Sequence, residues 1–176
     1  LAEKYLLPQI SQRCGLESAD LETVQTILPQ LAVMAEKMKK DLCRTLGALS
    51  DDYSRLDVSE NITSELQDQK ITLRNEVIDI QSITLNAKQL DTVTKFLFQA
   101  DEYQLSFIDK VVRSIPTVVN DVVAKSRWRM SDINYVLLAG GSVQNPLFVK
   151  HLQELLLSTK VILPRRPDTL VAEGAA

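Results

Sequence analysis

Apolar residues recur at helical spacing through the first fifty positions of the chain. In the clearest stretch, residues 30–46, the apolar positions fall on one side: Leu31, Met34, Ala35, Met38, Leu42 and Leu46. Residues three and four positions apart share a helix face, so the stretch predicts an amphipathic helix packed on a core. We expect this helix to end at Gly47, since glycine is common just after a helix C-terminus.

Prolines divide the neighbouring helical patterns. Residues 1–12 predict a helix in part, which Pro8 interrupts, and residues 21–28 predict a second helix. Pro29 either kinks that helix or opens a new one, because proline lacks a backbone N–H but is tolerated in a first turn.

The pattern changes to alternation between Tyr53 and Leu85. Apolar residues there occur in pairs two positions apart: Leu56 and Val58, Ile71 and Leu73, Ile78 and Ile80, and Ile83 and Leu85. This period is typical of half-buried antiparallel strands. We therefore expect a meander of short strands on the preceding helices.

Helical spacing returns at Asn86, where Asn86 and Gln89 resemble a capping box. It continues to about Lys125, with a break near Ala100 and a new turn or kink at Pro116.

The remainder predicts a strand, a diglycine turn, a helix, a strand and a final helix. Residues 135–139 read as a strand covered on both faces, and Asn145 and Pro146 as the start of a helix that runs to about Leu156. Residues 160–163 predict a second strand, and a helix is expected from Thr169. The predicted fold class is mixed α/β. The expected domains are residues 1–99, with helices and a small antiparallel sheet, and residues 100–176, a partial α/β subdomain.

Composition and charge narrow the function classes. Of the 176 residues, 45% are apolar and 24% charged, with a net charge of −3 and basic residues scattered among acidic ones. A nucleic-acid footprint would need a clustered basic face, and no apolar run approaches the length of about 20 residues that spans a bilayer. Cys14 and Cys43 are far apart and are expected as buried free thiols, which suits a reducing cytoplasm.

Two groups of residues have the chemistry of a ligand site. Gly140, Gly141 and Ser142 follow a predicted parallel strand, where a ligand can approach a backbone that lacks Cβ atoms. The alternative is a tight strand-to-helix connection. A stripe on one helix face can hydrogen-bond a nucleoside, or it can be a solvated face with an ion pair: Glu36, Lys39, Lys40 and Cys43.

Other polar residues have simpler interpretations. Asp168 after Pro167 either orients a ligand or lies in the N-cap region of the last helix. His151 lacks a partner at ligand spacing, and Asp51 and Asp52 fit turn positions. A metal site is therefore not expected.

Three runs of residues, taken in order, resemble the nucleotide-binding domain of DnaK-type heat-shock chaperones, the seventy-kilodalton family with an actin-like ATPase fold. EKMKK at 36–40 is similar to the charged helix that covers the nucleoside. AGGSVQNP at 139–146 resembles the family's adenosine loop, and RPDTLVAEGAA at 166–176 the motif before its closing helix. The chain resembles a fragment of lobe II of that domain, from a divergent member.

The resemblance implies a binding site for ATP or ADP, in which this chain supplies the adenosine side. The residues that it assigns to nucleotide binding are Glu36, Lys39, Lys40, Cys43, Gly140, Gly141, Ser142, Gln144 and Asp168. Three of them depart from the family pattern. Lys40 replaces an arginine, Gln144 stands in place of the arginine that stacks on adenine, and Cys43 in place of a small hydroxyl residue. These changes remove much of the adenine clamp, so we expect weak or shifted nucleotide binding.

The resemblance also implies what lies outside the chain. Phosphate loops and magnesium-binding carboxylates are expected upstream of Leu1, since no DxGxT-like loop occurs here. Both ends look like cuts within helical patterns, so we expect a piece of a longer ATPase that does not hydrolyse ATP alone. The implied partners of the intact protein are a nucleotide exchange factor, a J-domain co-chaperone and unfolded peptide.

Two other functions stay open. The chain fits a docking lobe for an exchange factor or another partner, in a chaperone-like protein whose nucleotide site has decayed. It also fits another member of the actin and sugar-kinase superfamily, although the stripe that begins at Glu36 argues against a sugar kinase.

Overall fold

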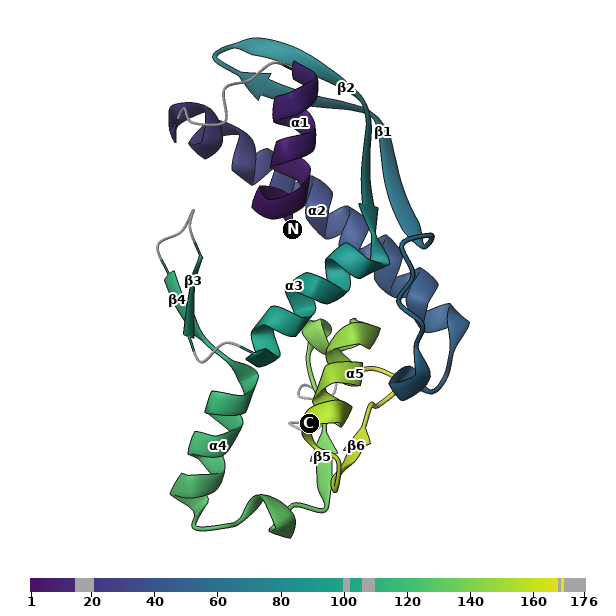
Figure 1. Ribbon diagram of the computed structural model, residues 1–176, viewed down its shortest axis with the longest axis vertical. Helices are drawn as coiled ribbons and strands as arrows, with labels where there is room; N and C mark the ends of the chain where they lie inside the picture. The colour runs from purple at the N-terminus through teal and green to yellow at the C-terminus, as the bar shows by residue number, and fades with distance from the viewer. Residues whose placement is uncertain (15–20, 100–101, 106–109, 168, 170–176) are drawn as a thin grey trace. The chain divides into compact units, whose positions relative to one another are not determined.

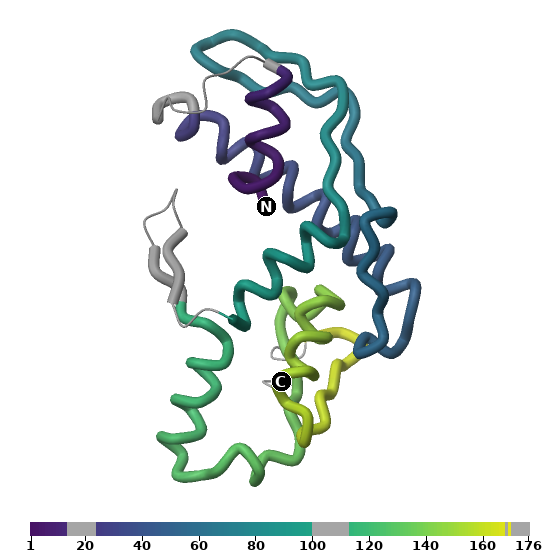
Figure 2. Tube along the Cα trace, in the orientation of Figure 1, coloured from purple at the N-terminus to yellow at the C-terminus, as the bar shows by residue number. Residues whose placement is uncertain are grey.

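The computed structural model describes residues 1–14, 21–99, 102–105, 110–167 and 169, and it shows a mixed α/β protein (Figure 1). The predicted fold class is confirmed at that level. The chain forms two compact units. Unit 1 comprises Leu1–Thr45 and Val58–Val93, and unit 2 comprises Leu46–Asp57 and Thr94–Ala176. Figure 2 lets the reader follow the chain from one unit to the other and back. The predicted division at residue 99 stays a prediction.

Unit 1 begins with helices. A π-helical turn, η1 (Ala2–Leu6), leads directly into α1 (Leu7–Cys14), and α2 runs from Leu21 to Leu49. The predicted apolar side of α2 is confirmed, since all six of its residues are buried: Leu31, Met34, Ala35, Met38, Leu42 and Leu46.

The two prolines do not divide the helices as predicted. Pro8 lies in the first turn of α1, directly after η1, and Pro29 lies inside α2, so it does not open a new helix. The alternative of a kink at Pro29 stays a prediction. Pro29 is exposed, whereas Ile27, Leu28 and Leu31 around it are buried. Burial of those side chains offsets the hydrogen bond that the proline removes.

Gly47 does not end α2, which continues to Leu49. A Cβ atom at Gly47 would lie 3.6 Å from Pro146 Cγ and 3.7 Å from Tyr53 Oη. Both are ordinary van der Waals distances, so neither packing nor a helix end requires a glycine at this position.

The predicted meander is one long hairpin. Strands β1 (Thr63–Leu73) and β2 (Glu76–Asn86) pair antiparallel along their whole length. Arg74 and Asn75 form the turn with φ of 49° and 68°, the conformation that a two-residue hairpin loop requires. Leu56 and Val58 form no strand; they follow a short 3-10 helix, η2 (Tyr53–Arg55).

A left-handed residue explains why the hairpin looked like separate strands. Asp68 has φ of 51° in the middle of β1. The buried positions shift phase across it, from Ser64 and Leu66 to Ile71 and Leu73. The alternation in the sequence therefore breaks at Asp68, where the pairing skips one pair of residues and then continues in the same register.

Helix α3 (Ala87–Gln99) begins with the predicted capping box. The Asn86 N–H donates to Gln89 Oε1 at 2.9 Å, and the Gln89 N–H donates to Asn86 Oδ1 at 2.8 Å. The predicted helical continuation to Lys125 is wrong, because a short hairpin follows, β3 (Glu102–Leu105) and β4 (Lys110–Arg113). Helix α4 (Ile115–Ser126) then starts at the expected proline, with Ser114 as its N-cap.

The end of unit 2 follows the predicted order. Strand β5 (Tyr135–Leu137) pairs parallel with β6 (Lys160–Ile162), and α5 (Pro146–Leu155) connects them. The core beneath them consists of Leu138, Val143, Val149, Leu152 and Leu156.

The expected cover on both faces of β5 is wrong for the part of the chain that is described. Tyr135 is 66% exposed and Leu137 58%. The sheet has two described strands. Val136 of β5 and Val161 of β6 pack against the core, and Leu138, just after β5, belongs to it. The helix expected from Thr169 lies outside the described residues, apart from Thr169 itself, which is in a turn. Among those residues, no helix combines the length and hydropathy that crossing a bilayer requires.

Candidate functional site

The charged stripe of α2 is a set of side chains in mutual contact. Lys39 Nζ lies 2.5 Å from Glu36 Oε2, and Lys40 Nζ lies 3.7 Å from Glu36 Oε1. The carboxylate thus lies between two ammonium groups, and all three side chains are more than one-third exposed. Exposed pairs of this kind contribute little to stability, so a ligand could replace these contacts at a small cost in free energy.

Cys43 adds a neutral group to the stripe. Its side chain is half-buried, and burial raises the pKa of the thiol to about 11, against the opposing effect of Lys39. The group is protonated at neutral pH, where it is a weak hydrogen-bond donor and a poor nucleophile. The side chain of Cys14, also predicted as a buried thiol, is not among those described.

The diglycine turn has a backbone that only glycine adopts readily. Gly140 has φ of 92° and ψ of 165°, a region that side chains exclude. Its N–H donates to the carbonyl of Pro167 at 2.6 Å. A Cβ atom on Gly141 would meet no described atom within 4 Å. The turn is therefore fixed at its first glycine and open at its second.

Of the residues that follow the two glycines, one is buried in the core and its two neighbours are exposed. A 3-10 turn, η4 (Gly141–Gln144), buries Val143 in the core of unit 2, while Ser142 and Gln144 are exposed. Asn145 follows; its Oδ1 accepts from the Leu147 N–H at 3.1 Å, and its Nδ2 donates to Thr94 Oγ1 at 3.3 Å. This Asn145 contact with α3 was not predictable from local sequence, because Thr94 lies 51 positions away.

The structure brings two of the three sequence motifs together. The bond from Gly140 to Pro167 joins the 139–146 run to the 166–176 run beside the carboxyl end of β5. Asp168 itself lies outside the described residues. The stripe Glu36 to Cys43 belongs to unit 1 and the diglycine turn to unit 2. The contact with Pro167 could not be expected from side-chain chemistry, because it uses the backbone carbonyl of that residue.

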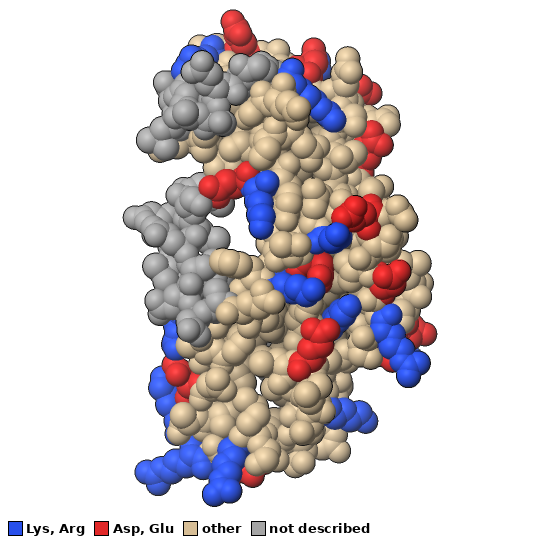
Figure 3. All heavy atoms as spheres, viewed as in Figure 1, with Lys and Arg blue, Asp and Glu red and all other residues tan. Residues whose placement is uncertain are grey.

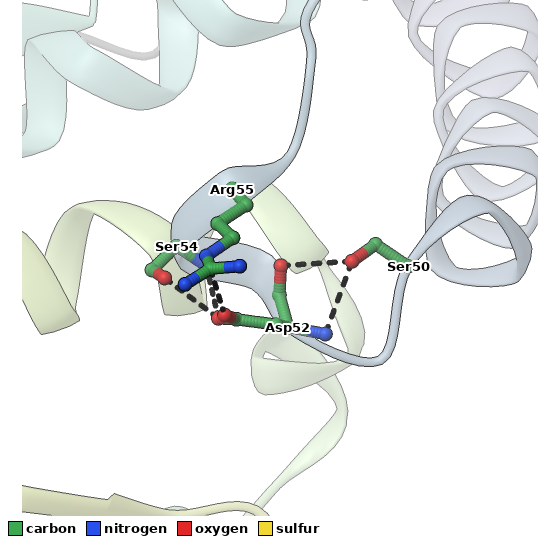
Figure 4. A network of polar contacts seen from close by, with 4 residues as sticks. All are labelled: Ser50, Asp52, Ser54 and Arg55. Atoms are coloured by element: carbon green, nitrogen blue, oxygen red, sulfur yellow. Dashed lines mark hydrogen bonds and ion pairs between the residues drawn. The ribbon is translucent and has the colours of Figure 1, made fainter.

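Asp52, near the end of α2, has a structural role. Asp52 caps η2, where its Oδ1 accepts from the Ser54 N–H at 3.1 Å and the Ser54 hydroxyl at 2.6 Å, with Arg55 alongside (Figure 4). The Ser54 hydroxyl is the main reason why the pKa of Asp52 lies below its ordinary value. Its bonds fit the predicted turn role.

His151 has a partner that the sequence did not predict. The ring is buried, and its Nδ1 lies 2.9 Å from Glu154 Oε2. Across the described residues, no three His, Cys, Asp or Glu side chains gather as metal ligands would. Figure 3 shows acidic and basic side chains interspersed on the face in view.

Neither models of known protein families nor curated protein sequences give a match to this chain.

Proposed function

We propose that this chain is a nucleotide-binding lobe of a divergent DnaK-type chaperone ATPase, with an actin-like fold, and that it supplies the adenosine side of a site for ATP or ADP. The observation that carries the proposal is the hydrogen bond from Gly140 to Pro167. It joins the two most specific motifs at the carboxyl end of a parallel strand, where α/β proteins bind ligands. Beside it, Gly141 presents open backbone.

Each candidate residue has a role in this proposal. The backbone of Gly141 and Ser142 lies under the adenosine and the adjoining phosphate. Glu36, Lys39 and Lys40 offer hydrogen bonds to ribose and base, and Cys43 offers a neutral thiol. The resemblance assigns Gln144 to the adenine side of the site, and it assigns Asp168, which lies outside the described residues, to the same end.

The rest of the reaction is assigned to other parts of the protein. No acidic cluster that fits magnesium occurs in the described part of the chain, so the proposal places the metal ligands in the opposite lobe. Lobe closure on ATP would then control a peptide-binding domain in the cytoplasm, with an exchange factor and a J-domain co-chaperone as partners.

Gly141 provides the sharpest test on the chain itself. We expect ADP to bind weakly, with a Kd near the millimolar range, and to shift the amide NMR signals of residues 139–145. Gly141→Val should abolish these shifts, because the added side chain fills the space that the nucleotide needs. The fold should be unaffected, since that space is open. Ser131→Val, at another exposed turn position, is the control and should leave the shifts unchanged.

Calorimetry distinguishes a nucleotide site that needs both lobes from a site that is complete within this chain. The intact domain should bind ADP far more tightly than this chain does. Tight binding by the chain alone, or ADP-induced shifts that survive Gly141→Val, would contradict the proposal.

The residue at position 144 favours a second function, a docking lobe for a partner protein. The Gln144 side chain is exposed and stands where the resemblance implies the arginine that stacks on adenine, so a docking lobe with a decayed nucleotide site is the competing proposal. Gln144→Arg in the intact protein restores a stacking guanidinium. If the parent binds no ATP and this variant does, the decayed-site proposal gains.

A further inference from the structure

The turn after α4 presents two arginines and the only tryptophan of the chain. Arg127, Trp128 and Arg129 are exposed, Trp128 to 63%. Neither guanidinium forms an ion pair or hydrogen bond with a described residue. Basic side chains gather over this end of α4 in Figure 3. Tryptophan and arginine are the residues that most often dominate binding energy in protein interfaces.

Backbone hydrogen bonds hold the three residues in place. The Arg127 N–H donates to the carbonyl of Ala124 at 3.3 Å, and the Trp128 N–H to Ser126 Oγ at 3.4 Å. The Arg129 N–H donates to Asp132 Oδ2 at 2.9 Å. Arg127 has φ of 63°, at a helix end where glycine is usual. A strained arginine whose charge has no partner within the described chain points to a partner elsewhere.

An apolar helix face leads up to the turn. No residue of α4 is buried, and Val118 and Val122, which lie one turn apart, are 42% and 62% exposed. Lys125 continues the same stripe. The surface therefore combines apolar side chains with cations at one end.

We propose that Arg127, Trp128, Arg129 and the Val118–Val122 face of α4 form a docking surface for an acidic amphipathic segment of a partner protein. Glutamate or aspartate side chains would pair with the two guanidinium groups, and apolar side chains would cover Trp128 and the valines. This inference goes beyond the nucleotide site and does not rest on it.

Charge and hydropathy disfavour two other kinds of partner. A nucleic acid would leave the valines uncovered, and the chain has a net charge of −3. An anionic membrane is usually recognised by clusters of about four to eight cations, whereas Lys125, Arg127 and Arg129 are three.

Fluorescence of Trp128 reports directly on this surface, because the chain has no other tryptophan. The probe is a short synthetic peptide in which pairs of glutamate and leucine alternate. We expect it to shift the emission to the blue and to protect the indole from acrylamide. The double variant Arg127→Ala with Arg129→Ala should weaken binding at least tenfold. The matched control, Arg44→Ala with Arg55→Ala, changes two exposed arginines elsewhere and should bind like the parent.

Arg127→Gly separates binding from folding. Glycine suits the left-handed backbone of this position, so the variant should be at least as stable as the parent chain. It should nevertheless bind the peptide severalfold more weakly than the parent, because it lacks one guanidinium group. The proposal is overturned if the peptide leaves Trp128 unchanged or if the control pair weakens binding equally. It is also overturned if phosphatidylserine vesicles or a single-stranded oligonucleotide shift the emission and the peptide does not.

Discussion

At the scale of single residues, the two adjacent glycines have different roles. Gly140 adopts a backbone that side chains exclude, while Gly141 faces open space. Gly140→Ala should lower the free energy of unfolding by about 1–3 kcal/mol, whereas Gly141→Ala should change it by less than about 0.5 kcal/mol. Urea unfolding of the two variants measures both values. Equal losses would mean that Gly141, too, is needed for folding, and the open space beside it would no longer point to a ligand.

The thiol of Cys43 should be unreactive. Burial raises its pKa to about 11, from an ordinary value of 9.0, so the thiolate is about 100-fold scarcer at pH 8 than in an exposed cysteine. Alkylation by iodoacetamide, followed by peptide mass spectrometry that distinguishes Cys43 from Cys14, should be slow in buffer and fast in urea. A rate in buffer that matches a small free thiol would contradict the buried environment.

At the scale of elements, Pro29 is a weak point of α2. It removes a backbone hydrogen bond from a helix interior and its ring is exposed. Pro29→Ala should therefore raise the free energy of unfolding by about 1–3 kcal/mol. Lys37→Ala, at an exposed position of the same helix, should change it by less than about 0.5 kcal/mol. Urea midpoints provide the comparison, and a destabilised Pro29→Ala chain would show that the proline fits a required bend.

The β1–β2 hairpin shows why local patterns predicted some elements and not others. The start of α3 was predictable because Asn86 and Gln89 cap each other within three positions. The hairpin instead depends on distant partners. The Gln30 amide donates to the Thr72 carbonyl at 2.8 Å and accepts from the Thr72 N–H at 2.9 Å, as a neighbouring strand would.

Gln9 pairs with Thr84 in the same way, at 2.8 and 3.2 Å. One glutamine side chain thus hydrogen-bonds the backbone at the outer edge of each strand, where the N–H and carbonyl groups would otherwise face solvent. The spacing of apolar residues does not indicate such distant contacts. The left-handed backbone of Asp68 also interrupts the alternation that would indicate one long strand. The predicted short strands were therefore wrong in length although their residues were strand residues.

At the scale of the whole molecule, the sequence indicates candidate site residues, and the structure adds the contact that connects two of the motifs. The assignment of the glycines and the charged helix face to ligand binding stays a prediction. The bond between Gly140 and Pro167 spans 27 positions and uses only backbone atoms, so no side-chain pattern encodes it. The same holds for exposure: the apolar run at 135–139 indicated a covered strand, and the described chain leaves Tyr135 and Leu137 open.

Surface carboxylates set how the stability of the molecule responds to acid. The Lys88 ammonium, 2.7 Å from Glu60 Oε1, lowers the pKa of that carboxyl below its ordinary value of 4.5. Arg113 does the same for Asp121, and the Ser54 hydroxyl for Asp52. A carboxyl whose pKa is lower in the folded chain stabilises the fold above its ordinary pKa, and this contribution is lost as the pH falls through the folded value.

The free energy of unfolding should therefore be steady from pH 7 to about pH 5 and decline below about pH 4.5. Each group is exposed, so each contribution is small and should shrink further in high salt. Glu60→Gln should make the acid decline shallower, because it removes one of the groups that must take up a proton; Glu65→Gln, on the exposed side of β1, is the control. Urea midpoints measured from pH 3 to pH 7 decide the matter. If both variants decline as the parent does, the acid response originates in other carboxyl groups.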